Sequence, residues 1–273
     1  MLYPIGIQAF EDIREGGYVY VDKTAFVYNL THSGKYVFLS RPRRFGKSLI
    51  LSTIEAYFEG RRDLFEGLAI AELEKEWNAY PVIHLDLNLG RSDTLENLRD
   101  KIDYLLTEQE EKHSITSAKK EPGLRFDNLI KRVSAQTGRK VVVLIDEYDK
   151  PLLETIGDPD LQEAMRKELR SLYSILKSCD SHIRFAMLTG VTKFGRLNVF
   201  SGLNNIYDLT FDPEYASLCG ITEQELLDTF SESIATMAKA NECSENEMVL
   251  RLRNMYDGYR LTQVKTRVYN PFS

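Results

Sequence analysis

The sequence predicts an α/β fold with a mainly parallel, five-stranded sheet, followed by a small helical subdomain. Short apolar segments alternate with longer amphipathic ones up to about residue 212, which is typical of strands joined by helices. Beyond about residue 220, signals for helix starts follow one another with no strand between them. We therefore expect an α/β core over residues 1–212 and a helical, lid-like subdomain over 213–273.

Five segments are predicted to form the strands. Residues 141–146, "VVVLID", are apolar at successive positions, which indicates a strand covered on both faces. The signal is weakest in residues 206–210. The complete set is 36–40, 81–87, 141–146, 184–190 and 206–210.

Helical periodicity predicts the segments between these strands. Ile50, Ile54, Tyr57 and Phe58 recur at helical spacing after the first strand. Leucine-rich patterns predict two longer helices over 95–113 and 161–176, whereas the polar residues 113–124 are expected to form a surface loop. In the C-terminal part, Thr222 with Glu225 and Ser244 with Glu247 are two capping boxes, and Gly258 stands where a left-handed C-cap is expected.

Bulk composition excludes several classes of protein. The net charge of −6 excludes a general attraction to nucleic acid, and no apolar run approaches the roughly 20 residues that span a bilayer. The N-terminus lacks the regions of a secretion signal. Three distant cysteines suit reduced thiols, and the four histidines have no metal-ligand spacing. We expect a cytoplasmic protein.

The stretch "FLSRPRRFGKSL" predicts a phosphate-binding loop, because it follows a predicted strand and opens a predicted helix. In such a loop backbone N–H groups cradle phosphates, the lysine neutralises their charge and the hydroxyl binds Mg²⁺. The alternative is a solvated basic turn before a helix. The predicted nucleotide-binding residues are Arg43, Arg44, Phe45, Gly46, Lys47, Ser48 and Leu49.

The loop departs from the usual pattern at its first position. Arg41 stands where a glycine is expected, and Pro42 can set the turn there instead. Gly46 is kept beside the lysine, where the backbone must pass closest to a phosphate. We therefore expect an altered loop entry and a functional nucleotide site.

An acidic pair follows the most apolar strand. Asp146 is predicted to hold Mg²⁺ and Glu147 to polarise the attacking water. The simpler interpretation is that acids often follow strands, but the pair comes after a phosphate loop with one predicted strand between them. Asp149 and Lys150 are expected to cap the next segment.

The strand ending at Thr189-Gly190 supplies a candidate sensor of the γ-phosphate, with Thr189 the first choice and Thr192 the second; a plain glycine turn is the alternative. Arg196 is either a charge-stabilising finger or a surface arginine. No stretch typical of guanine recognition is present, so ATP is the expected nucleotide. The adenine is expected to lie against residues 5–10.

These stretches together resemble the bacterial AAA-ATPase-like family. The resemblance covers "IGIQAFEDIRE", "YVYVDKTAF", "FLSRPRRFGKSL", "VVVLIDEYDKP", "LTGVTKFGRLNVFSGLNNIYDLT", "YDGYRL" and "VYNPFS". It implies a three-layer α/β/α phosphate-loop NTPase core with strand order 5-1-4-3-2, binding of ATP and Mg²⁺ by Lys47, Ser48 and Asp146, and water activation by Glu147. The family usually continues into a PD-(D/E)XK nuclease-like domain, whereas this chain ends at Ser273, so we expect no nuclease activity in it.

Three functions remain open on the sequence. The first is Mg²⁺-dependent ATP hydrolysis that is coupled to a partner. The second is an ATP-binding switch with slow or no turnover. The third is a nucleic-acid-associated factor that acts through Arg41, Arg43 and Arg44. Candidate partners are a nuclease-like effector domain or protein and a second copy in a homo-oligomer; no membrane partner is expected.

Overall fold

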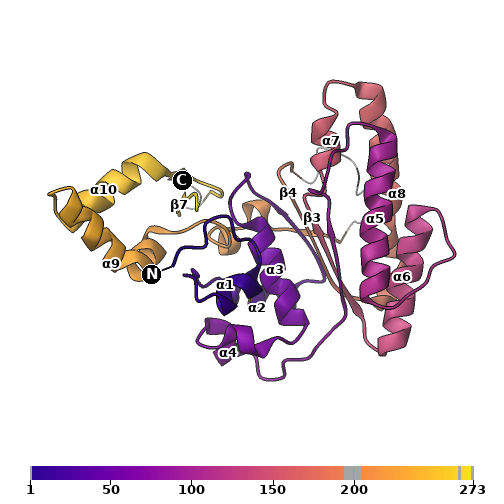
Figure 1. The fold of residues 1–273 in the computed structure, drawn as a ribbon, viewed down its shortest axis with the longest axis horizontal. Helices are drawn as coiled ribbons and strands as arrows, with labels where there is room; N and C mark the ends of the chain where they lie inside the picture. Colours follow the sequence, from indigo (N-terminus) through magenta and orange to yellow (C-terminus); the bar gives the residue numbers. More distant parts are fainter. Residues whose placement is uncertain (1, 194–198, 200–204, 264–265, 272–273) are drawn as a thin grey trace.

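A single parallel sheet organises the core of the protein. The computed structural model describes residues 2–193, 199, 205–263 and 266–271 (Figure 1). Its main sheet has five strands in the order β2-β3-β4-β1-β5, and every neighbouring pair is parallel. This order, read from the other edge, is the predicted 5-1-4-3-2.

The strands coincide closely with the predicted segments. They are β1 (Tyr36–Ser40), β2 (Val82–Asp86), β3 (Val141–Asp146), β4 (Ile183–Gly190) and β5 (Tyr207–Asp208). Strands β1 and β3 are buried along their whole length. The fifth strand is much shorter than predicted, because a 3₁₀ turn begins at Leu209 and removes the following residues from the sheet.

Helices cover both faces of the sheet, which confirms the three-layer core. Successive residues of β3 point to opposite faces: Val143 joins the hydrophobic core under one helical layer, and Val142 joins the core under the other. Figure 1 shows these layers on either side of the strands. One contains α5 (Leu95–Lys112), α6 (Pro122–Thr137) and α8 (Pro159–Ser178), and the other α1 (Phe10–Glu15), α2 (Thr24–Ser33), α3 (Lys47–Phe58) and α4 (Ala69–Leu73).

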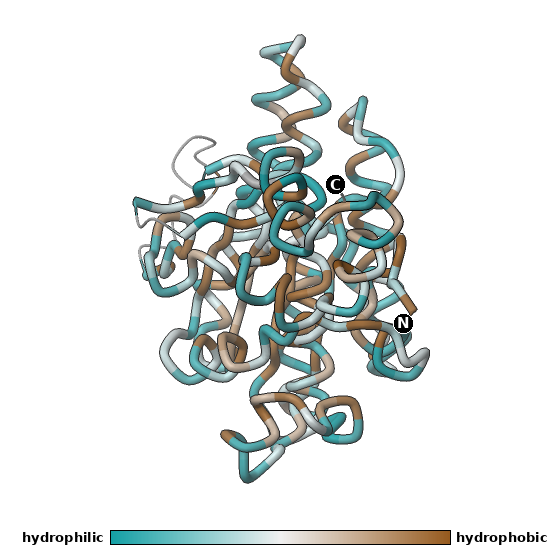
Figure 2. The backbone as a smooth tube through the Cα atoms, turned by 90° about the vertical axis from the view of Figure 1, so that its left-hand side faces the viewer, coloured by the Kyte–Doolittle hydropathy of each residue, from teal (hydrophilic) through white to brown (hydrophobic). Residues whose placement is uncertain are grey.

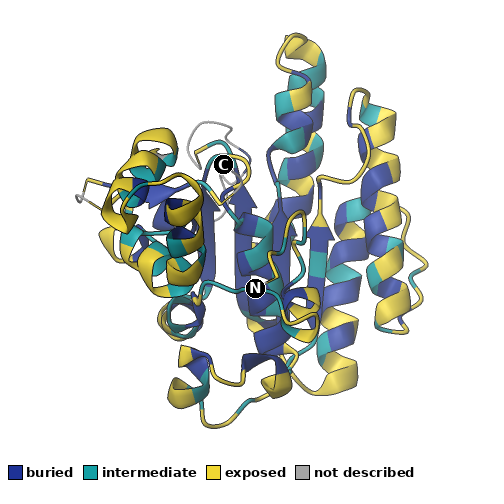
Figure 3. Ribbon diagram, turned by 60° about the vertical axis from the view of Figure 1, so that its left-hand side comes forward, coloured by how far each residue is buried: buried dark blue, intermediate teal, exposed yellow. Residues whose placement is uncertain are grey.

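The burial pattern agrees with this arrangement. Figure 3 shows the strands in dark blue between helices that are buried only on their inner sides. In Figure 2 the helices alternate between hydrophobic and hydrophilic residues, as amphipathic helices do. Within the described part of the chain, no helix is long and apolar enough to span a bilayer.

Helix α6 is the main element that the sequence analysis missed. The expected surface loop over 113–124 ends early, since the helix already begins at Pro122. The carboxylate of Glu121 accepts hydrogen bonds from the backbone N–H groups of the first turn, and Gly138 ends the helix in a left-handed conformation with φ of 66°. Proline at the start and glycine at the end of an apolar periodic segment were the signals that could have found it.

A separate helical hairpin follows the core. Helices α9 (Glu223–Ala240) and α10 (Glu245–Tyr256) lie beyond the α1–α4 layer in Figure 1, and short antiparallel strands β6 (Asp257–Tyr259) and β7 (Val268–Tyr269) come next. The predicted capping box of Thr222 and Glu225 is present. The predicted left-handed C-cap is not, because Gly258 has φ of 154° and already belongs to β6.

A buried ion pair joins this C-terminal unit to the core. Lys23, just before α2, donates from Nζ to Oε1 and Oε2 of Glu225 at 2.5 and 2.6 Å, and to the carbonyl oxygen of Ser217 at 2.7 Å. Lys23 is only 6% exposed. The start of α9 therefore lies against the residues that begin α2.

Candidate nucleotide-binding site

Several of the predicted site residues lie at or just beyond the carboxyl ends of neighbouring strands. Because β1, β3 and β4 are parallel, their carboxyl ends lie together, with β4 in the middle. Thr189 near the end of β4 is fully buried, and its hydroxyl donates to Oδ1 of Asp146 at the end of β3. Thr192, the second-choice sensor, forms no hydrogen bond with Asp146 within the described part of the chain; its backbone bonds to Tyr148 and Asp149 instead.

The loop between β1 and α3 curls around the side chain of Lys47. Gly46 adopts the left-handed conformation with φ of 86°, immediately before the helix. A Cβ at this glycine would meet no atom within 4 Å, so the backbone conformation and not a lack of space requires it. Nζ of Lys47 donates to the carbonyl oxygens of Arg41 and Pro42 at 3.2 and 3.1 Å. The ammonium group thus lies inside the curve of the loop.

Arg41 points away from this curve, into the protein. It is 2% exposed, and its guanidinium donates to the carbonyl oxygens of Ser40, Thr210 and Tyr215 at 3.0, 2.9 and 3.1 Å. Burial lowers the pKa of Arg41. A nucleic-acid contact through Arg41 is therefore excluded, whereas the neighbouring Arg43 and Arg44 are exposed beside the loop.

Phe45 also faces the protein. Its ring packs against Tyr259 at a centroid distance of 4.7 Å, and its carbonyl oxygen accepts from the backbone N–H of Gly220 at 3.3 Å. Both contacts reach the C-terminal segment that carries α9 and β6. Phe45 was predicted to bind the nucleotide as part of the loop; its side chain joins the loop to the C-terminal unit. Ser48 and Leu49 lie in the first turn of α3 and are half-buried.

Glu147 lies close enough to Lys47 for their charges to interact. Burial and the neighbouring carboxylate of Asp146 raise the pKa of Glu147, and the positive charges of Lys47 and Lys150 oppose the rise. Its backbone has φ of 49°, which is uncommon for a residue with a side chain. Strained conformations of this kind cluster at functional sites.

Two further carboxylates of this edge were not assigned to the site from sequence. Asp86 ends β2 in direct register with Asp146, and burial raises its pKa. Asp149 is fully buried, and its carboxylate accepts from the backbone N–H groups of Val191 and Thr192. It therefore holds the chain just beyond Thr189. Asp149 is also the N-cap residue of the next helix, α7 (Lys150–Glu154), as predicted, although its side chain makes no capping hydrogen bond there.

Gly190 is explained by the same packing. A Cβ at this position would lie 2.5 Å from the ring of Tyr148 and 2.6 Å from Oδ1 of Asp149. Neither group can move easily, since both are fully buried. The glycine therefore lets the tip of β4 approach the segment that follows β3.

The donor set suits Mg²⁺, which prefers oxygen ligands. Ser48 offers a hydroxyl and Asp146 a carboxylate. Among the described residues, no group of three or more His, Cys, Asp or Glu is placed to hold a metal ion. Phosphate oxygens and water would therefore complete the coordination, as is usual for Mg²⁺ bound with a nucleotide.

The remaining predicted residues are not placed at the site. Arg196 lies outside the described residues. In the expected adenine segment, Ile5 is 88% exposed, whereas Phe10 is buried and its backbone N–H donates to the hydroxyl of Ser52 on α3 at 2.8 Å. The adenine position stays a prediction.

A buried strand, a Gly-Lys-Ser loop, a following helix and acids at the tip of a second buried strand define an α/β phosphate-loop fold. A family model described as "Predicted AAA-ATPase" matches residues 4–200, and the chain belongs to this AAA-ATPase-like family. It is 42% identical over 270 residues to an "Uncharacterized protein in vnfD 5'region" of Azotobacter chroococcum mcd 1. That match covers 98% of this chain and 50% of the relative, so the chain spans about half the relative's length. No solved structure matches.

Proposed function

We propose that this protein binds ATP with Mg²⁺ at the carboxyl edge of its sheet and hydrolyses it. The observation that carries the proposal is the meeting of three groups there. The Lys47 ammonium lies inside the loop, and the Asp146 carboxylate is hydrogen-bonded to Thr189. Glu147 is close enough to Lys47 for the two charges to interact. Membership of a predicted ATPase family supports the general activity.

Each residue has a distinct role in the proposed reaction. Lys47 and the loop N–H groups bind the β- and γ-phosphates, and the exposed Arg43 and Arg44 add positive charge beside them. Ser48 and Asp146 would hold Mg²⁺, which neutralises charge on the phosphate oxygens. Thr189 orients the Asp146 carboxylate through its hydroxyl.

Glu147 acts as the general base. A water oxygen attacks the γ-phosphorus while its proton passes to the Glu147 carboxylate, and the bond from the γ-phosphorus to the bridging oxygen breaks to release ADP and phosphate. Because burial and Asp146 raise the pKa of Glu147, its carboxylate is a stronger proton acceptor than an exposed one. Asp149 and Asp86 shape the same edge without a proposed role in proton transfer.

The second candidate is an ATP-dependent switch with slow or no turnover. The contacts of Phe45 with Tyr259 and Gly220 favour the switch, because a loop that moves on binding phosphate would also change the position of the C-terminal unit. The two candidates share one site and differ only in rate. A nucleic-acid-associated role ranks third, since burial removes Arg41 from its proposed surface. The reduced cysteines support a cytoplasmic location.

Three variants of the purified protein test this proposal. Lys47→Ala should weaken ATP binding about tenfold or more, because a charge-assisted phosphate contact is lost. Glu147→Gln should keep ATP binding and lower phosphate release by roughly 10²–10⁴-fold. Lys140→Ala, at an exposed lysine just before β3 and so at the far end of that strand, is the control and should change neither quantity.

Nucleotide affinity would be measured by calorimetry with Mg²⁺, and turnover by release of phosphate. Undiminished hydrolysis in Glu147→Gln would contradict the assigned base. Clear ATP affinity with turnover no faster than the spontaneous reaction would select the switch. Equal ATP binding by the wild type and Lys47→Ala would refute the site itself.

A further inference from the structure

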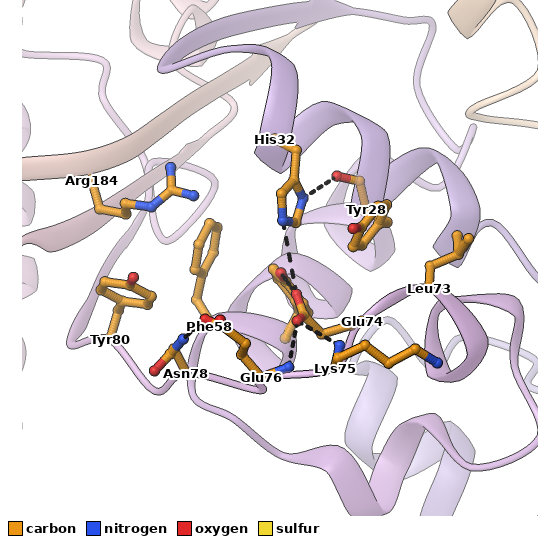
Figure 4. Close-up of a pocket in the computed structure, with 11 residues that line it drawn as sticks. Tyr28, His32, Phe58, Leu73, Glu74, Lys75, Glu76, Asn78, Tyr80 and Arg184 are labelled. Carbon is orange, nitrogen blue, oxygen red and sulfur yellow. Dashed lines mark hydrogen bonds and ion pairs between the residues drawn. The ribbon is translucent and has the colours of Figure 1, made fainter.

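A cavity lies at the opposite end of the sheet from the phosphate loop. It has a volume of about 370 Å³, within the usual size range of small-molecule sites, roughly 300–1,000 Å³. Its walls come from the ends of α2 and α3, the segment after α4, and the starts of β2 and β4 (Figure 4). These are the amino ends of the strands, so none of its lining residues belongs to the candidate nucleotide site.

One wall presents an arginine, Arg184, that has no partner of opposite charge among the described residues. Arg184 donates one hydrogen bond, to the carbonyl oxygen of Thr31 at 3.3 Å. Its guanidinium lies over the rings of Phe58 and Tyr80 at 5.9 and 5.8 Å. Among the described residues it forms no ion pair with a carboxylate. The rings fix the plane of the guanidinium and leave N–H donors on its edge, the geometry that recognises a carboxylate.

Another wall presents a carboxylate, Glu74, that has no lysine or arginine partner in the part of the chain that the structure describes. Glu74 accepts from the Tyr57 hydroxyl at 2.5 Å and from the backbone N–H groups of Lys75 and Glu76, both at 2.8 Å. Its nearest basic group in the described chain is the His32 ring, with Nε2 at 3.9 Å. Burial would raise the pKa of Glu74, but the hydrogen bond from Tyr57 and those from the backbone outweigh it and keep the group ionised.

The two unpaired charges do not neutralise one another. Figure 4 shows Arg184 and Glu74 on different sides of the cavity, with Phe58 between them. Lys75 and Glu76, which also line the cavity, are exposed, so solvent screens their charges more than those of the half-buried Arg184 and Glu74. Nζ of Lys75 donates to the carbonyl oxygen of Glu72 at 2.6 Å, and Glu76 accepts from Asn78 at 2.7 Å. Aromatic rings form much of the remaining wall, Tyr28 and Tyr80 among them.

We propose that this cavity binds a small zwitterion of the aromatic amino-acid class. The ligand carboxylate lies on the Arg184 guanidinium, its ammonium group faces Glu74, and its ring packs against the aromatic wall. Each charged group of the ligand thereby faces a side chain of opposite charge, so one molecule contacts both Arg184 and Glu74. This site is independent of the proposed ATPase activity.

Four probes of related shape separate the contributions. L-Phenylalanine carries both charges and the ring, 3-phenylpropionate lacks the ammonium group, phenethylamine lacks the carboxylate, and L-alanine lacks the ring. Binding to the nucleotide-free full chain would be followed by NMR titration up to about 10 mM, which detects affinities in the millimolar range. We expect L-phenylalanine to bind about tenfold or more tightly than each of the other three.

Protein variants identify the walls. Arg184→Gln should weaken L-phenylalanine binding about tenfold and leave phenethylamine binding unchanged, because that probe has no carboxylate to lose. Glu74→Gln should weaken L-phenylalanine and spare 3-phenylpropionate. Arg139→Gln is the matched control, because Arg139 lies over the same Tyr80 ring at 5.6 Å but is not part of the cavity wall.

The proposal is overturned if no probe binds the wild type, or if Arg139→Gln weakens L-phenylalanine as much as Arg184→Gln does. Preferential binding of 3-phenylpropionate would also overturn it, in favour of a simple anion site. Thermal unfolding of each variant would identify one that fails to fold, in which case the probe series on the wild type still decides.

Discussion

Replacing Arg41 by methionine is the sharpest test of how the phosphate loop is held. Methionine fills much of the same space but cannot donate to the carbonyl oxygens of Ser40, Thr210 and Tyr215. Each lost bond is worth roughly 1 kcal/mol, so the three together amount to about 3 kcal/mol. Removing a buried charge, whose Nε has no hydrogen-bond partner, offsets part of this loss. We expect a net loss of about 2 kcal/mol.

Urea unfolding of the purified protein measures this quantity, and ATP affinity measured in parallel reports the shape of the loop. Arg43→Met is the matched control, because Arg43 lies two positions away but is exposed. Arg43→Met should change the free energy of unfolding by no more than about 0.5 kcal/mol, as is usual at surface positions. If Arg41→Met is as stable as the wild type, or if Arg43→Met is equally costly, the buried guanidinium does not hold the loop.

Two further predictions concern the same core. Gly190→Ala should lower the free energy of unfolding by about 2 kcal/mol and reduce ATP turnover, because its Cβ would lie 2.5 Å from the Tyr148 ring. Gly157→Ala is the control, because a Cβ at that position would have no atom within 4 Å. Equal unfolding midpoints for the two variants would contradict the packing argument. His84→Gln should destabilise the protein more at about pH 6 than at about pH 9, by an amount on the order of 1 kcal/mol. Burial opposes protonation of His84, but the bond at 2.7 Å to Glu55 outweighs it and raises the pKa of His84, while the pKa of Glu55 falls to about 2. The stabilisation from His84 is therefore complete below its unfolded pKa of about 6.5 and lost as the pH rises through the higher folded pKa; a pH-independent difference in urea midpoint would contradict it.

Local signals were sufficient for much of the fold. The continuous apolar run before Asp146 predicted a strand buried on both faces, and every residue of β3 is buried. Gly46 and Lys47 predicted a turn that opens a helix, and the left-handed glycine stands directly before α3. Helix α6 was not predicted although its end signals are local too, because its first turn continues a polar stretch that is typical of a loop.

The site was harder to predict, because several of its contacts join distant segments. Thr189 was named only as a sensor, whereas its hydroxyl is bonded to Asp146, 43 positions earlier. Asp149 is the N-cap residue of α7, as predicted, but its carboxylate bonds to the chain beyond β4. The position of Asp86 beside Asp146 follows only from the register of β2 with β3. Which side chains share a sheet edge depends on strand order, which no single segment encodes.

Features with a local cause follow from the amino-acid sequence: buried strands, the left-handed turn before Lys47 and the chemistry available at the strand ends. The directions in which Arg41 and Phe45 point depend on how distant segments pack. Two partners of Arg41, Thr210 and Tyr215, lie 169 and 174 positions later in the chain. A charged side chain enters the interior only where distant carbonyl groups are already placed to receive it, and that placement is a property of the packed chain.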